Sequence, residues 1–133
     1  MDTINPKIKL SALWLFILLN IIFRDIHQFT MKSHLEMLLT GYYNGTKVTE
    51  TIMLIGGIVL EIPIAMVLFS LLLKRKLNRP INIAAVVISF GLFMMELPSD
   101  MDDTFFKIIE MIGLGAIVVT AWKWRSDDQA YSL

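Results

Sequence analysis

Ionisable residues interrupt segments of this chain that are otherwise apolar. Glu61 lies in the middle of the most apolar stretch, residues 48–73, and Pro63 follows it closely. A carboxyl group in the middle of a bilayer costs about 2.5–3.5 kcal/mol on insertion scales, and a proline removes a backbone hydrogen-bond donor. Neither residue favours a purely structural helix. A carboxyl in this position can hold a proton or bind a cationic or polar molecule, so the pattern indicates a polar interior.

Other polar residues recur at helical spacing. Glu50 precedes Glu61 by 11 residues, and eleven residues turn a helix only about 20° beyond three full turns, so both glutamates lie on one face. Asn20, Arg24 and His27 form a second stripe at the end of the first apolar segment. Two helices are therefore expected to present ionisable side chains to a shared interior.

Composition identifies the bilayer as the solvent of this chain. Of its 133 residues, 56% are hydrophobic, above the roughly 45–50% of soluble domains. The absence of cysteine excludes disulfide, thiolate and iron–sulfur chemistry. The 12 basic and 12 acidic residues balance, which gives no sign of nucleic-acid binding. No established catalytic motif is present, and His34 and Glu36 are too weak a signal to predict a metal site.

The apolar segments predict an all-α integral membrane protein. We expect one domain, residues 1–133, that forms an antiparallel four-helix bundle with spans at about residues 9–29, 48–73, 81–97 and 104–124. We place Pro80 at the first position of the third span, capped by Asn78 or Arg79. The connection between the first two spans is expected to contain a short interfacial helix. The positive-inside rule puts both termini in the cytoplasm, because eight basic residues fall on that side: Lys7, Lys9, Lys74, Arg75, Lys76, Arg79, Lys123 and Arg125.

This topology gathers the charges of four helices at the non-cytoplasmic end. The predicted polar cavity contains Arg24, Asp25, His27, Glu50, Glu96, Lys107 and Glu110, with Glu61 deeper. Charges inside spans almost always pair. Arg24 and Lys107 are therefore each expected to pair with one or more of the carboxylates Asp25, Glu50, Glu96 and Glu110. Because carboxylates outnumber cations, one must be protonated, hydrated, or paired with His27 or a ligand, and Glu61 is our candidate for holding a proton. An ion-pair network that only fixes helix register is the alternative.

Four segments resemble a bacterial family of small four-helix membrane proteins of unknown function. They are LWLFILLNIIFRDIHQF, NGTKVTETIMLIGGIVLEIPIAMVLFSLLL, LNRPINIAA and FFKIIEMIGLGAIVVTAWKW. The resemblance covers roughly residues 8–125, and its most specific pieces contain Asp25-Ile-His27, Val48-Thr49-Glu50, Leu60-Glu61-Ile62-Pro63 and Glu110. More loosely, the chain is similar to DoxX-like four-helix proteins, some of which are associated with quinone-linked oxidation. The resemblance implies a multi-pass protein of the bacterial inner membrane, and it implies no activity or cofactor.

Three functions remain open from the sequence. The first is binding or movement of a small molecule, ion or proton at Glu61 and Glu50. The second is an accessory subunit that docks on a larger membrane complex through glycine-containing faces. The same faces could also form a homodimer. The third is a membrane enzyme acting on a lipid or quinone, with His27 and either Asp25 or Glu110 as an acid–base pair. We rank small-molecule binding first and the accessory role second.

Overall fold

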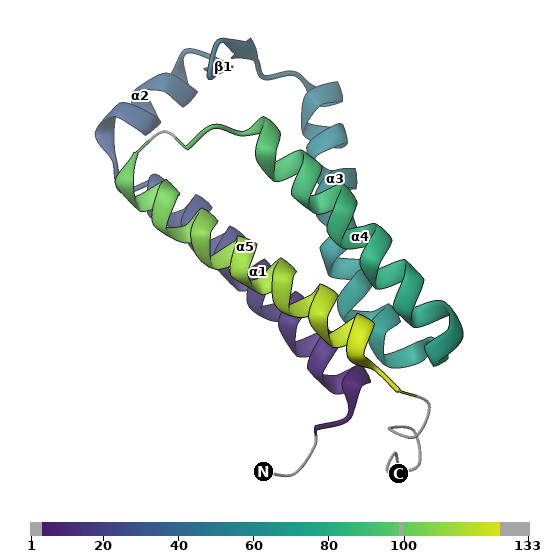
Figure 1. The fold of residues 1–133 in the computed structure, drawn as a ribbon. Coiled ribbons are helices and arrows are strands. Elements are labelled where there is room, and N and C mark those ends of the chain that lie inside the picture. The colour runs from purple at the N-terminus through teal and green to yellow at the C-terminus, as the bar shows by residue number, and fades with distance from the viewer. Residues whose placement is uncertain (1–3, 99, 126–133) are drawn as a thin grey trace.

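Four long antiparallel helices make up most of the computed structural model, which describes residues 4–98 and 100–125. They are α1 (Pro6–Gln28), α3 (Glu50–Leu72), α4 (Arg75–Met95) and α5 (Met101–Lys123) (Figure 1). A short helix, α2 (Lys32–Leu39), and a hairpin of β1 (Tyr42–Tyr43) and β2 (Thr46–Lys47) connect α1 to α3. All four long helices are long and apolar enough to cross a membrane. The four predicted apolar helices and the short connecting helix are thus confirmed as elements.

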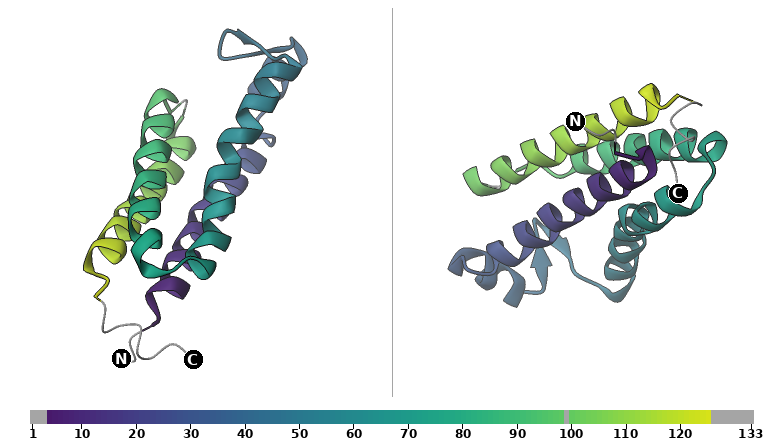
Figure 2. Two further views of the ribbon diagram at one scale, coloured as in Figure 1. Left: turned by 90° about the vertical axis from the view of Figure 1, so that its right-hand side faces the viewer. Right: turned by 90° about the horizontal axis from the view of Figure 1, so that it is seen from below.

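The long helices form two layers. Helix α1 packs on α3 and α5, and α4 packs on the same two helices. Figure 2 shows α1 with α3 in one layer and α4 with α5 in the other, joined by the short α3–α4 turn. The beginning of α1, the α3–α4 turn and the end of α5 lie at one end of the bundle, and α2 with the hairpin lies at the other (Figure 1). The bundle therefore has the predicted up-and-down order.

Side-chain caps and one tight turn set the limits of several elements. Thr49 and Asp100 accept hydrogen bonds from the backbone N–H groups three residues ahead and begin α3 and α5. These groups would otherwise lack partners at a helix N-terminus. Asn44 and Gly45 adopt positive φ angles of 47° and 79°, the conformation that a two-residue hairpin turn requires.

Helix α4 begins at Arg75, so the predicted start near Pro80 is wrong. The reason lies in Asn78, whose side-chain amide donates hydrogen bonds to the carbonyls of Ser70 and Leu73, at distances of 2.7 and 3.2 Å. These bonds satisfy carbonyls at the end of α3 and allow α4 to begin directly after Lys74. Pro80 then sits inside the helix, where it removes the one bond that its N–H would have donated.

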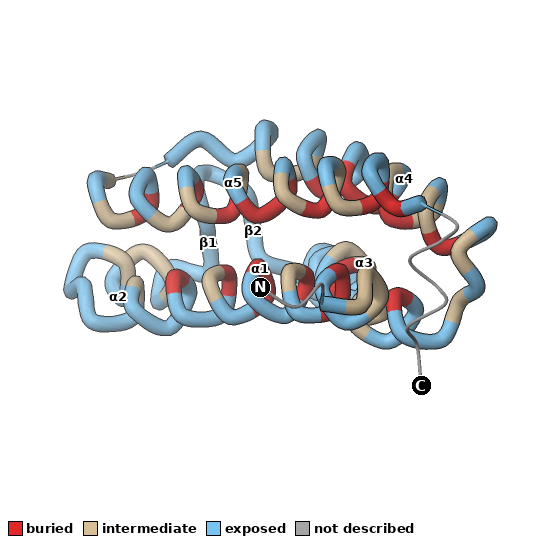
Figure 3. The backbone as a smooth tube through the Cα atoms, turned by 60° about the horizontal axis from the view of Figure 1, so that its bottom comes forward, coloured by how far each residue is buried: buried red, intermediate tan, exposed pale blue. Residues whose placement is uncertain are grey.

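The core lies between the two layers (Figure 3). Its fully buried side chains include Leu10, Trp14 and Ile17 of α1 and Leu114 and Ile117 of α5. Contact between these helices is close, because a Cβ added at Gly113 would lie 2.8 Å from Cγ1 of Ile17.

Three other glycines of the long helices do not lie at close helix contacts within the described part of the chain. A Cβ at Gly56, Gly57 or Gly115 would meet no atom within 4 Å. Of Gly56, Gly57, Gly113 and Gly115, only Gly113 lies at a close helix contact among the described residues.

A buried polar network lies near the α3–α4 turn. The side-chain oxygen of Asn82 accepts hydrogen bonds from Trp14 Nε1, at 2.7 Å, and from Ser70 Oγ, at 3.3 Å. Its amide donates to the backbone and side-chain oxygens of Asn78. Because every member finds a partner, the network can be buried without a desolvation penalty, and it fixes α1, α3 and α4 relative to one another.

Candidate functional site

A cavity of about 360 Å³ lies at the end of the bundle that carries α2 and the hairpin. This volume is near the lower limit of small-molecule sites, which run from about 300 to 1,000 Å³. One part of its lining is apolar and comes mainly from the long helices: Ile21, Phe29, Leu38, Gly56, Val59, Leu60, Leu92, Phe93 and Leu97. The other part is polar: Arg24, Asp25, Gln28, His34, Tyr43, Asn44, Glu96 and Asp103. The cavity thus offers both polar and apolar side chains to one occupant.

Arg24 is the centre of the polar part. Its guanidinium lies 3.5 Å from carboxylate oxygens of Asp25, Glu96 and Glu110, and 3.6 Å from Asp103. Only 10% of its side chain is exposed. The predicted pairing of Arg24 is therefore confirmed for three carboxylates from α1, the end of α4 and α5.

Asp103 is a partner of Arg24 that the sequence analysis missed. It belongs to the acidic first turn of α5 and has the appearance of a capping residue. Its spacing of seven residues from Glu110 places both on one face of α5. That spacing was the available signal for a shared partner.

Glu110 is fully buried, and neither of its carboxylate oxygens has a hydrogen-bond partner within the described part of the chain. Its nearest positive group is NH1 of Arg24. The charge of Arg24 is therefore the main compensation for burying this carboxylate.

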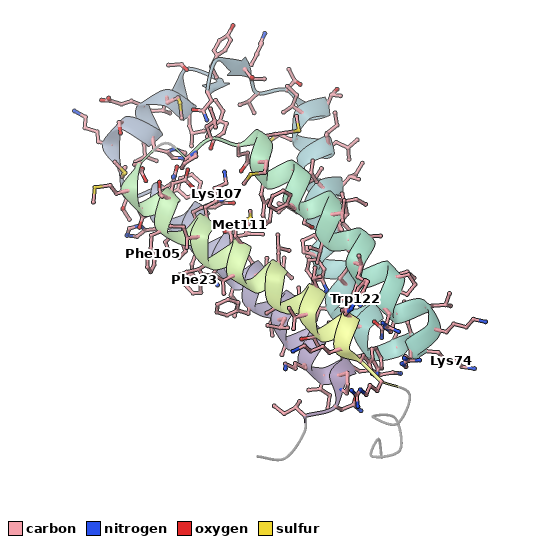
Figure 4. All side chains as sticks on the ribbon, viewed as in Figure 1. Phe23, Lys74, Phe105, Lys107, Met111 and Trp122 are labelled. Atoms are coloured by element: carbon pink, nitrogen blue, oxygen red, sulfur yellow. The ribbon has the colours of Figure 1, made fainter. Side chains whose placement is uncertain are left out.

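Lys107 does not form the predicted ion pair. It is buried on the inner side of α5, close to Met111, whereas Phe23 and Phe105 point away from the bundle (Figure 4). Its ammonium donates a hydrogen bond to the backbone carbonyl of Glu96. Because α4 ends at Met95, this carbonyl has no helical partner, and the lysine satisfies it.

The two histidines have different surroundings from those expected. Nδ1 of His27 lies 2.6 Å from Asp102, and neither residue lines the cavity. His27 is therefore not paired with Asp25 or Glu110. His34 does line the cavity, with its ring in edge-to-face contact with Phe29 and Tyr43 at centroid distances of 5.7 and 6.0 Å. The chain turns between α1 and α2, so the two histidines lie on different helices.

Glu50 and Glu61 lie outside the cavity. Both are exposed on α3, and neither side chain has an ion-pair or hydrogen-bond partner among the described residues. Helix α3 instead turns Gly56, Val59 and Leu60 toward the cavity. The two glutamates share one face, as predicted, but that face points away from Arg24.

Tyr43 contributes a phenol to the polar lining. Burial raises its pKa, and the carboxylates of Glu96, Asp103 and Asp25 raise it further. The phenol is therefore neutral at physiological pH and can donate a hydrogen bond to an occupant of the cavity.

Comparison with known proteins identifies the family of this chain. The profile of a family of unknown function, DUF6326, matches residues 3–131. The chain belongs to the DUF6326 family. No curated protein and no solved structure matches it. The predicted membership in a family of unknown function is confirmed, whereas the looser likeness to DoxX-like proteins stays a prediction.

This DUF6326 site combines a charged cluster with apolar side chains in the lining of one cavity. Within residues 4–98 and 100–125, no group of three or more histidine, aspartate or glutamate side chains is placed to hold a metal ion. The buried Arg24, its carboxylates and the aromatic side chains can bind and orient a polar head group, while the apolar lining accepts a hydrocarbon part.

Proposed function

We propose that this DUF6326 protein spans the bacterial inner membrane and binds a small amphipathic molecule in the cavity beneath α2 and the hairpin. The observation that carries the proposal is that one cavity is lined both by polar side chains, including Arg24, and by apolar side chains that come mainly from α1, α3 and α4. An amphipathic molecule from the outer half of the bilayer matches both parts.

The charge distribution supports the orientation. The eight basic residues named above lie at the beginning of α1, at the α3–α4 turn and the first residues of α4, and at the end of α5, which share one end of the bundle. With both termini in the cytoplasm, the cavity lies on the opposite side. Its ligand would enter from the periplasm or from the outer leaflet.

Gly56 provides the sharpest test. It lines the cavity, and a Cβ there meets no atom within 4 Å, so Gly56→Leu is expected to fill the cavity without disturbing the helices. Gly57→Leu is the matched control, because Gly57 is equally open but does not line the cavity. We expect native mass spectrometry of protein in a mild neutral detergent to detect a bound small mass in the wild type and in Gly57→Leu, and to lose it in Gly56→Leu.

Two results would contradict the proposal. One is a wild-type protein that carries no small mass and gains none when the host's lipid extract is added. The other is a bound mass that Gly56→Leu retains at wild-type occupancy, which would place the ligand elsewhere on the protein.

A second candidate, an accessory subunit, is favoured by the exposure of α3. Only 11% of its apolar window is buried, against 28–39% for the other three long helices. Glu50 and Glu61 lie on its exposed surface, and ionisable groups that face lipid are unfavourable. A protein partner that covers α3 would remove this penalty.

A photo-crosslinker distinguishes this candidate from simple ligand binding. Leu54 of α3 and Val87 of α4 are both 65% exposed. An accessory subunit predicts one discrete adduct with a second polypeptide from position 54 and none from position 87. Equal, diffuse labelling at both positions would argue against it.

The enzyme hypothesis receives no support from this geometry. His27 is separated from the cavity and paired with Asp102, so it is not placed to exchange a proton with an occupant.

A further inference from the structure

We infer that the head group recognised in this cavity is an alkylated ammonium ion. The inference rests on the proposed function, because it names the class of ligand for the same cavity. Three observations support it: the saturation of Arg24, the surplus of carboxylates, and a row of aromatic rings beside them.

Arg24 has little capacity left for an anionic ligand. Four carboxylates lie within 3.6 Å of its guanidinium. Its side chain is 10% exposed, and the buried Glu110 depends on its charge. An anion entering the cavity would have to displace one of these carboxylates, and it would meet repulsion from the others.

The carboxylates, by contrast, are short of positive charge. Asp25 and Glu96 line the cavity, with side chains 57% and 64% exposed. The contact of each carboxylate with Arg24 therefore leaves more than half of its side chain accessible to an occupant of the cavity. Lys107 forms no ion pair with Asp25 or Glu96, and its ammonium donates a hydrogen bond to a backbone carbonyl. A cation at the polar end of the cavity would therefore add the charge that the cluster lacks.

Aromatic rings in the lining favour an alkylated cation over a primary ammonium ion. Phe29, His34 and Tyr43 form a continuous edge-to-face row in the lining. Aromatic faces attract cations, and they replace the hydration of a methylated ammonium more readily than that of a strongly hydrated primary amine. Carboxylates beside aromatic rings, with apolar helices beyond, match a trimethylammonium head on a short hydrocarbon chain.

Three probes with the same chain and different heads test the inference. Octyltrimethylammonium, 1-octanol and octanoate are titrated into protein in a mild neutral detergent, with occupancy followed by native mass spectrometry. Each titration is repeated with Gly56→Leu, so that partition into micelles is subtracted. We expect the ammonium to bind about tenfold more tightly than octanol, and octanoate to bind most weakly.

Substitutions of residues that line the cavity test which side chains cause the preference for the ammonium probe. Glu96→Gln and Tyr43→Leu are expected to weaken the ammonium by about three- to tenfold and to leave octanol unchanged. Glu36→Gln and Tyr42→Leu are matched controls, because these side chains lie on α2 and the hairpin outside the cavity lining. The controls should bind all three probes as the wild type does.

The outcomes separate this inference from the proposed function. If octanol or octanoate binds as tightly as the ammonium, and Gly56→Leu abolishes that binding, the cavity is a ligand site but the head-group inference is overturned. If none of the probes shows binding that depends on Gly56, both are overturned. An ammonium preference that Glu96→Gln and Tyr43→Leu leave intact would also overturn the inference.

Discussion

The indole N–H of Trp14 donates a 2.7 Å hydrogen bond to the side-chain oxygen of Asn82, across the centre of the bundle. Both residues are fully buried. Trp14 belongs to α1 and Asn82 to α4, and Ser70 of α3 donates to the same oxygen. One amide therefore connects three helices.

Removing this amide should destabilise the bundle. Asn82→Ala leaves Trp14 Nε1 and Ser70 Oγ without their acceptor, and we expect a loss of about 1–3 kcal/mol. Asn20→Ala is the control, because Asn20 bonds only to a carbonyl of its own helix, and its effect should be below about 0.5 kcal/mol. Unfolding in detergent, followed by circular dichroism, measures both. Equal stability of the two variants would show that the network does not contribute.

The Arg24–Glu110 pair predicts a strongly non-additive double mutant. Arg24→Met leaves the buried Glu110 carboxylate without its main counter-charge and should cost about 3–5 kcal/mol. Arg24→Met combined with Glu110→Met removes both charges and should recover most of that loss. The comparison is made by the same unfolding measurement on both single variants and the double variant. Additive losses would mean that Glu110 is compensated by another group.

Two glycines of α5 should respond in opposite directions to alanine. Gly113→Ala forces a methyl group against Ile17, and we expect a loss of about 1–3 kcal/mol. Gly115→Ala places its methyl in open space and should be neutral or stabilise by up to about 1 kcal/mol, because alanine is the better helix former. The difference between their melting temperatures tests the α1–α5 contact. A harmless Gly113→Ala would show that the two helices can move apart without loss.

Glu61→Gln should leave the cavity unchanged. Glu61 is exposed on α3 and does not line the cavity, so any bound small mass should persist at wild-type occupancy. The free energy of unfolding of the isolated protein should change by less than about 0.5 kcal/mol. Loss of the bound mass in native mass spectrometry would instead place Glu61 within reach of the ligand, through a rotation of α3.

The helices and the gathering of charge around Arg24 were predictable from the sequence for identifiable reasons. Long apolar segments define helices of membrane-spanning length. Antiparallel order then brings the end of α1, the end of α4 and the beginning of α5 to the same depth. Arg24, Asp25, Glu96 and Glu110 could therefore be placed at the same end of the bundle, whereas the rotation of each helix decides which of the charges at that depth meet.

The rotation of α3 was not predictable in the same way. This helix has a mean hydropathy of 2.5 and is apolar on nearly every face, so hydrophobic periodicity cannot identify its inner side. We assumed that Glu50 and Glu61 mark the interior, as ionisable residues in spans usually do. Packing of α3 on α1 and α4 turns Gly56 and Leu60 inward instead.

The aromatic part of the cavity depends on a loop whose path the sequence does not specify. His34 and Tyr43 come together because α1 ends at Gln28 and the positive φ of Asn44 reverses the hairpin. Asn-Gly is typical of a tight turn, but this local pattern does not say where the hairpin folds relative to α1.

Arg24 and Glu110 lie on the first and the last of the long helices, and this separation has a consequence for biogenesis. The ribosome delivers α1 well before α5, since chains are made from the N-terminus. Until α5 enters the bilayer, Arg24 has only the largely exposed Asp25 and Glu96 to neutralise it. A nascent chain that stops before α5 therefore displays a poorly compensated arginine at membrane depth. A finished chain buries this arginine against Glu110, so the exposed charge marks an unfinished chain. We therefore expect a truncated product to be degraded and not to accumulate as a three-helix protein.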